Sequence, residues 1–150
     1  MTSLQKGDIA PPFSAKDQDG ITHSLTDYKG KKLVVFFYPK SNTPTCTVEA
    51  CNMRDNFDRF KSKNYEILGV SADSAKAQGS FSKKFDLPFP LLADEDKSVI
   101  NAFHVWGPKK FMGKEFDGIH RTTFVIDEKG IIEEVITDVK SKIHADQILK

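Results

Sequence analysis

The stretch Leu33-Val-Val-Phe-Phe-Tyr-Pro-Lys-Ser-Asn-Thr-Pro-Thr-Cys46 contains two different patterns. Its first six residues form a continuous apolar run, which is typical of a short central β-strand buried on both faces. Pro39 ends that run, and residues 40–44 are rich in turn formers. A helix is then expected from about Thr45 to Lys61. The stretch therefore predicts a buried strand that leads directly into the N-terminus of a helix.

Strands and helices alternate on either side of this stretch. A hairpin is expected over residues 13–25, with its turn at Asp19-Gly20, and a second central strand is expected over residues 65–71. The other expected elements are a helix near 74–85, a short strand at 91–92, a short helix capped by Asp96 that ends near Phe103, a long loop that contains Trp106, strands at 122–127 and 131–137, and a helix at 143–149. This order predicts an α/β protein with a mixed central β-sheet flanked by helices and an N-terminal β-hairpin, which matches a thioredoxin-like fold.

Length and charge restrict the class of protein. A chain of 150 residues fits a single domain, 1–150, with one hydrophobic core. Its 22 Lys and Arg against 21 Asp and Glu leave a net charge of +1, so nothing favours a nucleic acid or an acidic membrane as partner. No apolar run approaches the roughly 20 residues that span a bilayer, and residues 1–8 resemble neither a signal peptide nor a transit peptide. We therefore expect a cytoplasmic protein.

The chain has only two cysteines, Cys46 and Cys51, which are too few for a disulfide scaffold. In a reducing compartment such a pair binds metal or does redox chemistry more often than it braces a fold. Two buried thiols that act as small hydrophobic side chains are the structural alternative. The spacing of five residues does not separate these possibilities by itself.

The position of Cys46 favours redox chemistry. Thr43 is a good N-cap, and Pro44 suits the first helical position because its missing N–H would be unpaired there. Cys46 then falls in the first turn, where unpaired N–H groups and the positive end of the helix dipole stabilise a thiolate. The thiolate is the nucleophilic form of cysteine. Cys46 is therefore the candidate nucleophile.

The position of Cys51 argues against a permanent disulfide. In an ideal helix, Cα atoms five residues apart are separated by roughly 8.6 Å. A disulfide rarely tolerates a Cα separation above about 7 Å. Cys46 and Cys51 can therefore bond only if the first turns of the helix unwind, which makes a transient bridge the physically consistent disulfide.

Two other uses of the cysteine pair fit the sequence less well. Zinc usually takes four ligands, with cysteines two to four residues apart. The four histidines (His23, His104, His120 and His144) have no ligand spacing to one another or to the cysteines, so we expect no metal. A thioredoxin-type disulfide reductase would need Cys-x-x-Cys, which is absent from the sequence.

At this point a family resemblance is visible. The run from Pro39 to Cys46, with the pattern Pro-x-x-x-Thr-x-x-Cys, resembles the active-site signature of the peroxiredoxins. Cys51 is similar to the resolving cysteine of the bacterioferritin-comigratory-protein/PrxQ subfamily, the atypical two-cysteine type. The segments 7–13 and 106–127, the latter with Arg121 before Thr-Thr-Phe, also look like that subfamily, so the similarity covers nearly the whole chain.

One residue departs from the subfamily pattern. Thr45 stands where many members carry glycine between the proline and the cysteine. Threonine is tolerated early in a helix, so we expect a small effect on backbone mobility and none on the type of reaction.

The resemblance implies roles for the residues around the cysteines. Arg121 would point its guanidinium at the Cys46 sulfur, where a fixed cation favours the thiolate and can hold a peroxide oxygen. Glu49 lies one turn beyond Cys46 and would orient Arg121. Pro39 would shape and shield the pocket. Each residue also has a simpler interpretation. Arg121 would be an ordinary surface arginine at a strand end, Glu49 would only complement the helix dipole, and Pro39 would only end the strand.

The resemblance also implies a catalytic cycle. Cys46 would attack a hydroperoxide, with Thr43, Arg121 and the Cys46 backbone N–H stabilising charge on the two oxygens. The resulting sulfenic acid would condense with Cys51, and thioredoxin or glutaredoxin would reduce the disulfide. No cofactor is implied. We expect a monomer, because the C-terminal extension of dimeric two-cysteine peroxiredoxins has no counterpart here. The alternative from another class is a non-catalytic thioredoxin-fold binding module or redox sensor.

Overall fold

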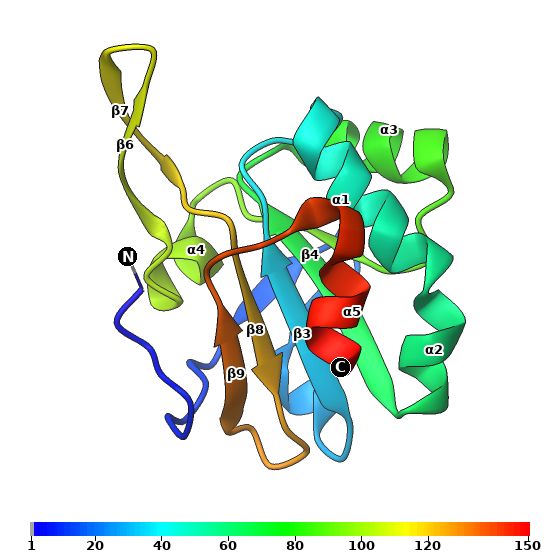
Figure 1. Ribbon diagram of the computed structural model, residues 1–150. Helices are drawn as coiled ribbons and strands as arrows, with labels where there is room; N and C mark the ends of the chain where they lie inside the picture. The colour runs from blue at the N-terminus through cyan, green and yellow to red at the C-terminus, as the bar shows by residue number, and fades with distance from the viewer. Residues whose placement is uncertain (1) are drawn as a thin grey trace.

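The computed structural model describes residues 2–150 and is built around a five-stranded mixed sheet (Figure 1). The strands stand in the order β5-β4-β3-β8-β9, which are Leu91–Ala93, Tyr65–Ser71, Lys32–Phe37, Thr122–Ile126 and Ile132–Ile136. Strand β3 pairs parallel with β4 and antiparallel with β8. The mixed sheet of a thioredoxin-like α/β fold is therefore confirmed, and the apolar run that starts at Leu33 is its central strand.

Alternate residues of β3 face two separate core clusters, as the period of two in a strand requires. Val34 and Phe36 share a cluster with side chains from helices α1 (Pro44–Asp55), α3 (Ala75–Phe85) and α5 (His144–Leu149). The second cluster joins Leu33, Val35 and Phe37 to the N-terminal segment and to α4 (Ser98–Ala102). Both faces of β3 are thus covered, which explains its continuous apolar sequence.

The short elements are also close to expectation. The N-terminal hairpin is formed by β1 (Ser14–Lys16) and β2 (Thr22–Ser24) and continues into the 3-10 turn Leu25–Tyr28. A second 3-10 turn, Ser141–Ile143, precedes α5. Among residues 2–150, no helix combines the length and the apolar character needed to cross a lipid bilayer.

The predicted helix from Thr45 to Lys61 is wrong in one respect, because it is two helices. Helix α1 ends at Asp55, and α2 (Phe57–Ser62) begins after Asn56. Asn56 has φ −109° and ψ 12°, and its side-chain Nδ2 donates to the Asn52 carbonyl oxygen. This side chain supplies a local partner for the backbone in place of the helical one, which is the usual reason that asparagine interrupts helices.

The cap of α4 also differs from the prediction. Asp96 accepts one bond, from the Ser98 N–H. The buried carboxylate of Asp94 accepts two, from the N–H groups of Val99 (3.2 Å) and Ile100 (2.7 Å). Asp94 is therefore the main cap, and Asp96 supports it.

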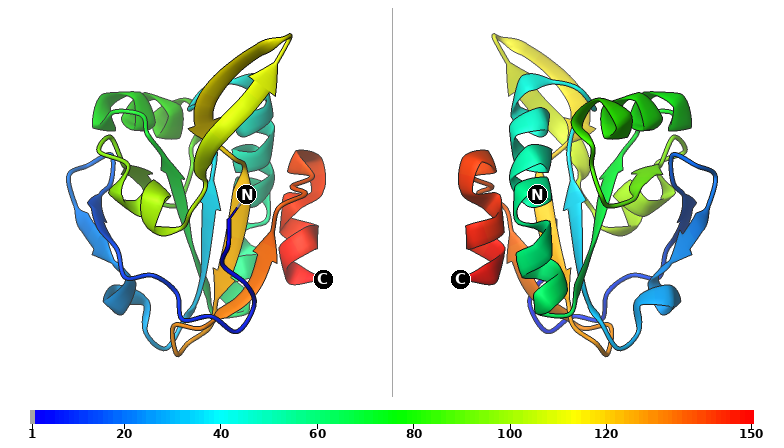
Figure 2. Two further views of the ribbon diagram at one scale, coloured as in Figure 1. Left: turned by 90° about the vertical axis from the view of Figure 1, so that its left-hand side faces the viewer. Right: turned by 90° about the vertical axis from the view of Figure 1, so that its right-hand side faces the viewer.

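The long loop predicted around Trp106 is wrong, because this segment is a hairpin. Strands β6 (Trp106–Phe111) and β7 (Lys114–Ile119) pair antiparallel along their whole length and project from the body of the molecule (Figures 1 and 2). Met112 and Gly113 have φ of 51° and 79°, the positive values that a tight hairpin turn requires. Most residues of both strands are exposed, so the sequence lacks the alternation that marks a half-buried strand.

A close approach in the sheet predicts the effect of a substitution. A Cβ atom at Gly69 would lie 2.8 Å from Leu91 Cδ2 and 2.9 Å from Phe36 Cζ, whereas at Gly79 in α3 the nearest atom would be 3.9 Å away. Gly69→Ala should lower the free energy of unfolding by about 1–3 kcal/mol through overpacking. Gly79→Ala should raise it by about 0.5–1 kcal/mol because glycine is a poor helix former. Urea denaturation measures both, and an unchanged stability of Gly69→Ala would contradict this packing.

Candidate active site

The candidate nucleophile lies where β3 delivers the chain to α1 (Figure 1). Thr43 has the extended backbone of an N-cap, Pro44 is the first helical residue, and Cys46 follows in the first turn. The first bond of the helix runs from the Thr47 N–H to the Thr43 carbonyl, so the Cys46 N–H belongs to the unpaired first turn. The Cys46 side chain is 2% exposed.

The loop between β3 and α1 is held by the end of β4. The Asp73 carboxylate accepts the Ser41 N–H at 2.7 Å and the Ser71 hydroxyl at 2.6 Å. Next to this loop the buried Tyr38 hydroxyl donates to Gln78 Oε1, whose amide nitrogen donates in turn to the Ser71 hydroxyl. Burial raises the pKa of Tyr38 well above its ordinary value, so this group remains a neutral donor. The turn that presents Cys46 is therefore fixed from two neighbouring elements.

Arg121, the residue before β8, contacts both Cys46 and Glu49. Its Nη2 donates to the Cys46 sulfur at 3.1 Å, and its Nη1 donates to Glu49 Oε1 at 2.7 Å. Burial alone would lower the pKa of Arg121, but Glu49 and Cys46 outweigh burial and hold it above its ordinary value. One planar guanidinium thus places a fixed positive charge on the sulfur, an arrangement that favours the thiolate.

The Glu49 carboxyl is completely buried. Burial raises its pKa from 4.5 to about 7, against the opposing attraction of Arg121. Its Oε1 accepts from Arg121, but Oε2 has no hydrogen-bond partner and lies 3.6 Å from His144 Nε2. A buried carboxylate with an unsatisfied oxygen is costly, so the site holds Glu49 at an energetic expense.

Cys51 lies on the same unbroken helix as Cys46, and both are free thiols. Cys46 is buried and Cys51 is half-buried. Because α1 is continuous from Pro44 to Asp55, the ideal separation of roughly 8.6 Å between the two Cα atoms applies. This conformation cannot hold a disulfide between them.

Of the predicted site residues, three contact one another directly in the structure and the others lie beside them. Cys46, Glu49 and Arg121 are in direct contact. The Thr43 hydroxyl donates to the Lys40 carbonyl oxygen at 2.7 Å and makes no side-chain cap bond, so Thr43 caps α1 with its backbone only. Pro39 is half-buried, two residues after the end of β3.

Two residues near the site were not expected from the sequence. Lys109 of β6 extends across Gly118 and donates from Nζ to the Ile119 carbonyl oxygen at 2.8 Å. Burial and the nearby Arg121 lower its pKa. His144, the first residue of α5, is fully buried behind Glu49. Neither has a local sequence signal, because Lys109 depends on the unpredicted hairpin and His144 on a long-range contact.

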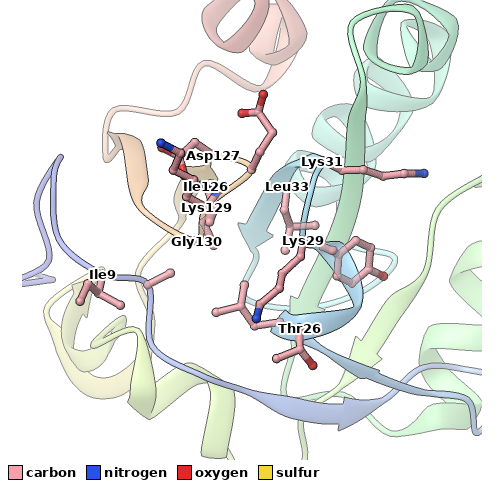
Figure 3. Close-up of a pocket in the computed structure, with 13 residues that line it drawn as sticks. Ile9, Thr26, Lys29, Lys31, Leu33, Ile126, Asp127, Lys129 and Gly130 are labelled. Carbon is pink, nitrogen blue, oxygen red and sulfur yellow. Dashed lines mark hydrogen bonds between the residues drawn. The ribbon is translucent and has the colours of Figure 1, made fainter.

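A separate pocket lies away from the cysteines (Figure 3). It has a volume of about 130 Å³ and is lined by residues that include Ile9, Leu33, Ile126 and Gly130. Neither cysteine nor Arg121 reaches it. Within residues 2–150, no three His, Cys, Asp or Glu side chains are grouped as a metal site requires. The contacts around Cys46 are therefore the candidate site.

Comparison with known proteins identifies the family. The AhpC/TSA family matches residues 6–135. Peroxiredoxin Bcp of Escherichia coli K12 is 50% identical over 149 residues, covering 99% of this chain and 96% of the relative. Peroxiredoxin Bcp of Bacillus subtilis is 43% identical over 148 residues, covering 99% and 94%.

Solved structures agree with this assignment. A cysteine-to-serine mutant of Xylella fastidiosa PrxQ superposes with a TM-score of 0.92 at 32% identity, covering 99% of this chain and 95% of the other. A mutant of Xanthomonas campestris Peroxiredoxin Q gives a TM-score of 0.88 at 34% identity, covering 99% and 94%. The chain therefore belongs to the AhpC/TSA family and, within it, to the Bcp/PrxQ peroxiredoxins, which are thiol peroxidases.

Proposed function

We propose that this chain is a thioredoxin-dependent peroxidase in which Cys46 reduces hydrogen peroxide and organic hydroperoxides and Cys51 resolves the oxidised product. The observation that carries the proposal is the contact of one guanidinium, that of Arg121, with both the Cys46 sulfur and Glu49. This contact supports Cys46 rather than Cys51 as the nucleophile. The family supplies the substrate class, a hydroperoxide, and the need for a thiol reductant.

In the first step the Cys46 thiolate attacks the terminal oxygen of the hydroperoxide, in line with the O–O bond. An S–O bond forms as the O–O bond breaks, sulfur is oxidised to the sulfenic acid, and the other oxygen takes a proton and leaves as alcohol or water. Arg121 and the Cys46 N–H stabilise the negative charge that develops on the oxygens, and Thr43 joins them when its hydroxyl turns from the Lys40 carbonyl oxygen to the peroxide. Pro39 limits the access of water to the sulfur.

In the second step the start of α1 unwinds so that Cys51 reaches the Cys46 sulfenic acid. The Cys51 sulfur displaces hydroxide, which leaves as water, and a disulfide forms. Asn52 directly follows Cys51 and is held on both sides: its Nδ2 donates to the Lys142 carbonyl oxygen at 2.9 Å, and its Oδ1 accepts the Ala145 N–H at 2.8 Å. These bonds anchor the rest of α1, so unwinding is confined to the turns before Asn52.

In the third step an external dithiol protein reduces the disulfide by exchange. We propose thioredoxin, with glutaredoxin as the alternative, acting on a monomer in the cytoplasm. The two free thiols suit a reducing compartment. Reduction lets residues 46–51 refold and restores the contact between Arg121 and Cys46.

Cysteine variants test the two thiol roles. Cys46→Ser should abolish peroxide consumption in an assay coupled to NADPH, thioredoxin reductase and thioredoxin. Cys51→Ser should complete one fast turnover and then recycle slowly. A Cys46→Ser protein with near wild-type activity would contradict the assignment of the nucleophile. A wild-type rate no faster than that of free cysteine would favour a redox sensor.

Far-UV circular dichroism tests the unwinding step. The disulfide form should have less helix than the reduced form, because residues 46–51 leave α1. Cys51→Ser, exposed to one equivalent of peroxide, is the control and should keep its helix content. Identical spectra for the reduced and disulfide forms of the wild type would contradict the step.

The buried carboxyl makes stability depend on pH with a definite sign. The pKa of Glu49 is raised to about 7 in the folded state from 4.5, so the unfolded state loses this proton first as pH rises. The contribution of Glu49 to stability therefore falls between pH 4.5 and 7 and is constant above that window. The melting temperature of wild type minus that of Glu49→Gln should decrease from pH 5 to pH 8. A difference that does not change with pH would show that Glu49 ionises normally.

A further inference from the structure

Glu49 Oε2 faces His144 across a buried contact that the proposed mechanism does not use. Within residues 2–150, Glu49 Oε2 is the buried side-chain oxygen without a hydrogen-bond partner. His144 Nε2 is 3.6 Å from Oε2, too far for a hydrogen bond. Both side chains are fully buried, so neither is exposed to bulk solvent. The contact therefore needs a physical explanation.

The protonation of the His144 ring follows from its neighbour Gln147. The orientation of the Gln147 amide is set by the backbone: Oε1 accepts the Lys140 N–H at 2.9 Å, and Nε2 donates to the Asp138 carbonyl oxygen at 2.9 Å. Gln147 Oε1 is also 2.8 Å from His144 Nδ1. Because this oxygen can only accept, Nδ1 carries the proton.

The other nitrogen of the neutral ring is then an acceptor. His144 Nε2 lies 2.7 Å from the Thr123 hydroxyl, which can donate to it. Glu49 Oε2 lies 3.6 Å from the same nitrogen, whose single lone pair accepts the Thr123 hydroxyl when the ring is neutral. If Glu49 is ionised and His144 is neutral, two acceptors face each other with no hydrogen between them. A single proton between the two atoms turns this contact into a hydrogen bond when the Thr123 hydroxyl rotates away from Nε2 and the two atoms move closer.

The charges around the site favour keeping that proton. A Cys46 thiolate and an ionised Glu49 are two negative charges in direct contact with one positive charge, that of Arg121, and a proton on Glu49 would leave one of each in contact. Besides Glu49, the charged groups that act on His144 are Arg121, which disfavours a charged ring, and Glu134 of β9, which is paired with Lys150 at 2.6 Å. Lys109 faces Cys46 and Arg121 from β6. Burial raises the pKa of Glu49 and lowers that of His144, which places the proton on the carboxyl.

We propose that His144 is a positioning residue for the peroxidase reaction: its Nε2 shares one proton with Glu49 Oε2 and thereby holds the carboxyl that fixes Arg121 against the Cys46 sulfur. The inference deepens the proposed function and rests on it. His144 touches neither the sulfur nor the peroxide. It acts through Glu49, from an element nearly 100 residues away from Cys46 in the chain.

Nuclear magnetic resonance tests the shared proton without any assay of activity. In reduced protein labelled with ¹⁵N-histidine, the ring signals of His144, assigned by their absence from His144→Gln, should show an Nδ1–H ring. They should shift in one step between pH 5 and pH 8 as the shared proton leaves, and Glu49→Gln should abolish the step. A His144 signal that is insensitive both to pH and to Glu49→Gln would overturn the proposal. Loss of activity in all samples would count against the proposed function instead.

Kinetics test whether the contact matters for the reaction. His144→Phe removes the acceptor and should slow the reaction with peroxide about tenfold at pH 6, the cost of losing one buried hydrogen bond to a charged network. His144→Gln offers a permanent N–H donor to Glu49 Oε2. At pH 8 this variant should therefore react with peroxide as fast as the wild type, but its rate should not show the pH dependence of the wild type. His104→Asn, an exposed histidine with φ 55° where asparagine is tolerated, is the matched control and should leave the pH profile unchanged.

A purely structural role for His144 would produce a different result. Both variants would then slow the reaction by the same factor at every pH, in proportion to their loss of melting temperature, and that result would overturn the proposal. If His144→Phe does not fold, the pH profile of His144→Gln decides the question together with the resonance experiment. Rates are followed by stopped-flow fluorescence of Trp106 in a single turnover, so the reductant does not enter the measurement.

Discussion

The guanidinium of Arg121 is held between the Cys46 sulfur and the Glu49 carboxyl, which project from the same face of helix α1. Cys46 and Glu49 are three residues apart, so α1 places them side by side and a single guanidinium reaches both. The Glu49 carboxyl orients the guanidinium, and the guanidinium presents its positive charge and N–H donors to the Cys46 sulfur. The arrangement requires the helix to be intact, since residues three apart in an extended chain point in different directions. The geometry of the site is thus a property of folded α1.

In the proposed cycle the same helix opens for Cys51 to act, and a buried acidic group in its first turns favours that opening. The buried Glu49 carboxyl with its unsatisfied oxygen lies between the two cysteines in the chain. Unwinding takes this group into water, so the energetic cost of burying it favours opening. The bonds of Asn52 to the turn before α5 and to α5 itself would resist further unwinding. The segment that opens therefore contains both cysteines and the carboxyl between them.

Much of this arrangement follows from local sequence, and the parts that do not have physical reasons. The continuous apolar run from Leu33 predicts a central strand buried on both faces, and Thr43 with Pro44 predicts a helix start. Arg121 has no local signal, and only its resemblance to a family segment indicated its contact with Cys46. The hairpin at 106–119 was missed because exposed strands lack a hydrophobic alternation. The interruption at Asn56 depends on a side-chain bond that apolar periodicity does not report.

His144 shows why the layer behind the reacting atoms is the hardest to predict. Its place behind Glu49 depends on the packing of α5 against α1, and its tautomer depends on Gln147, whose amide is oriented by the backbone before α5. None of these contacts is periodic or close in sequence to Cys46. The Ala145 N–H next to His144 is also bonded to Asn52, the anchor of α1. The element that meets the buried carboxyl is therefore also bonded to the anchor of α1, so in the proposed cycle α5 would couple the folded site to the extent of its unwinding.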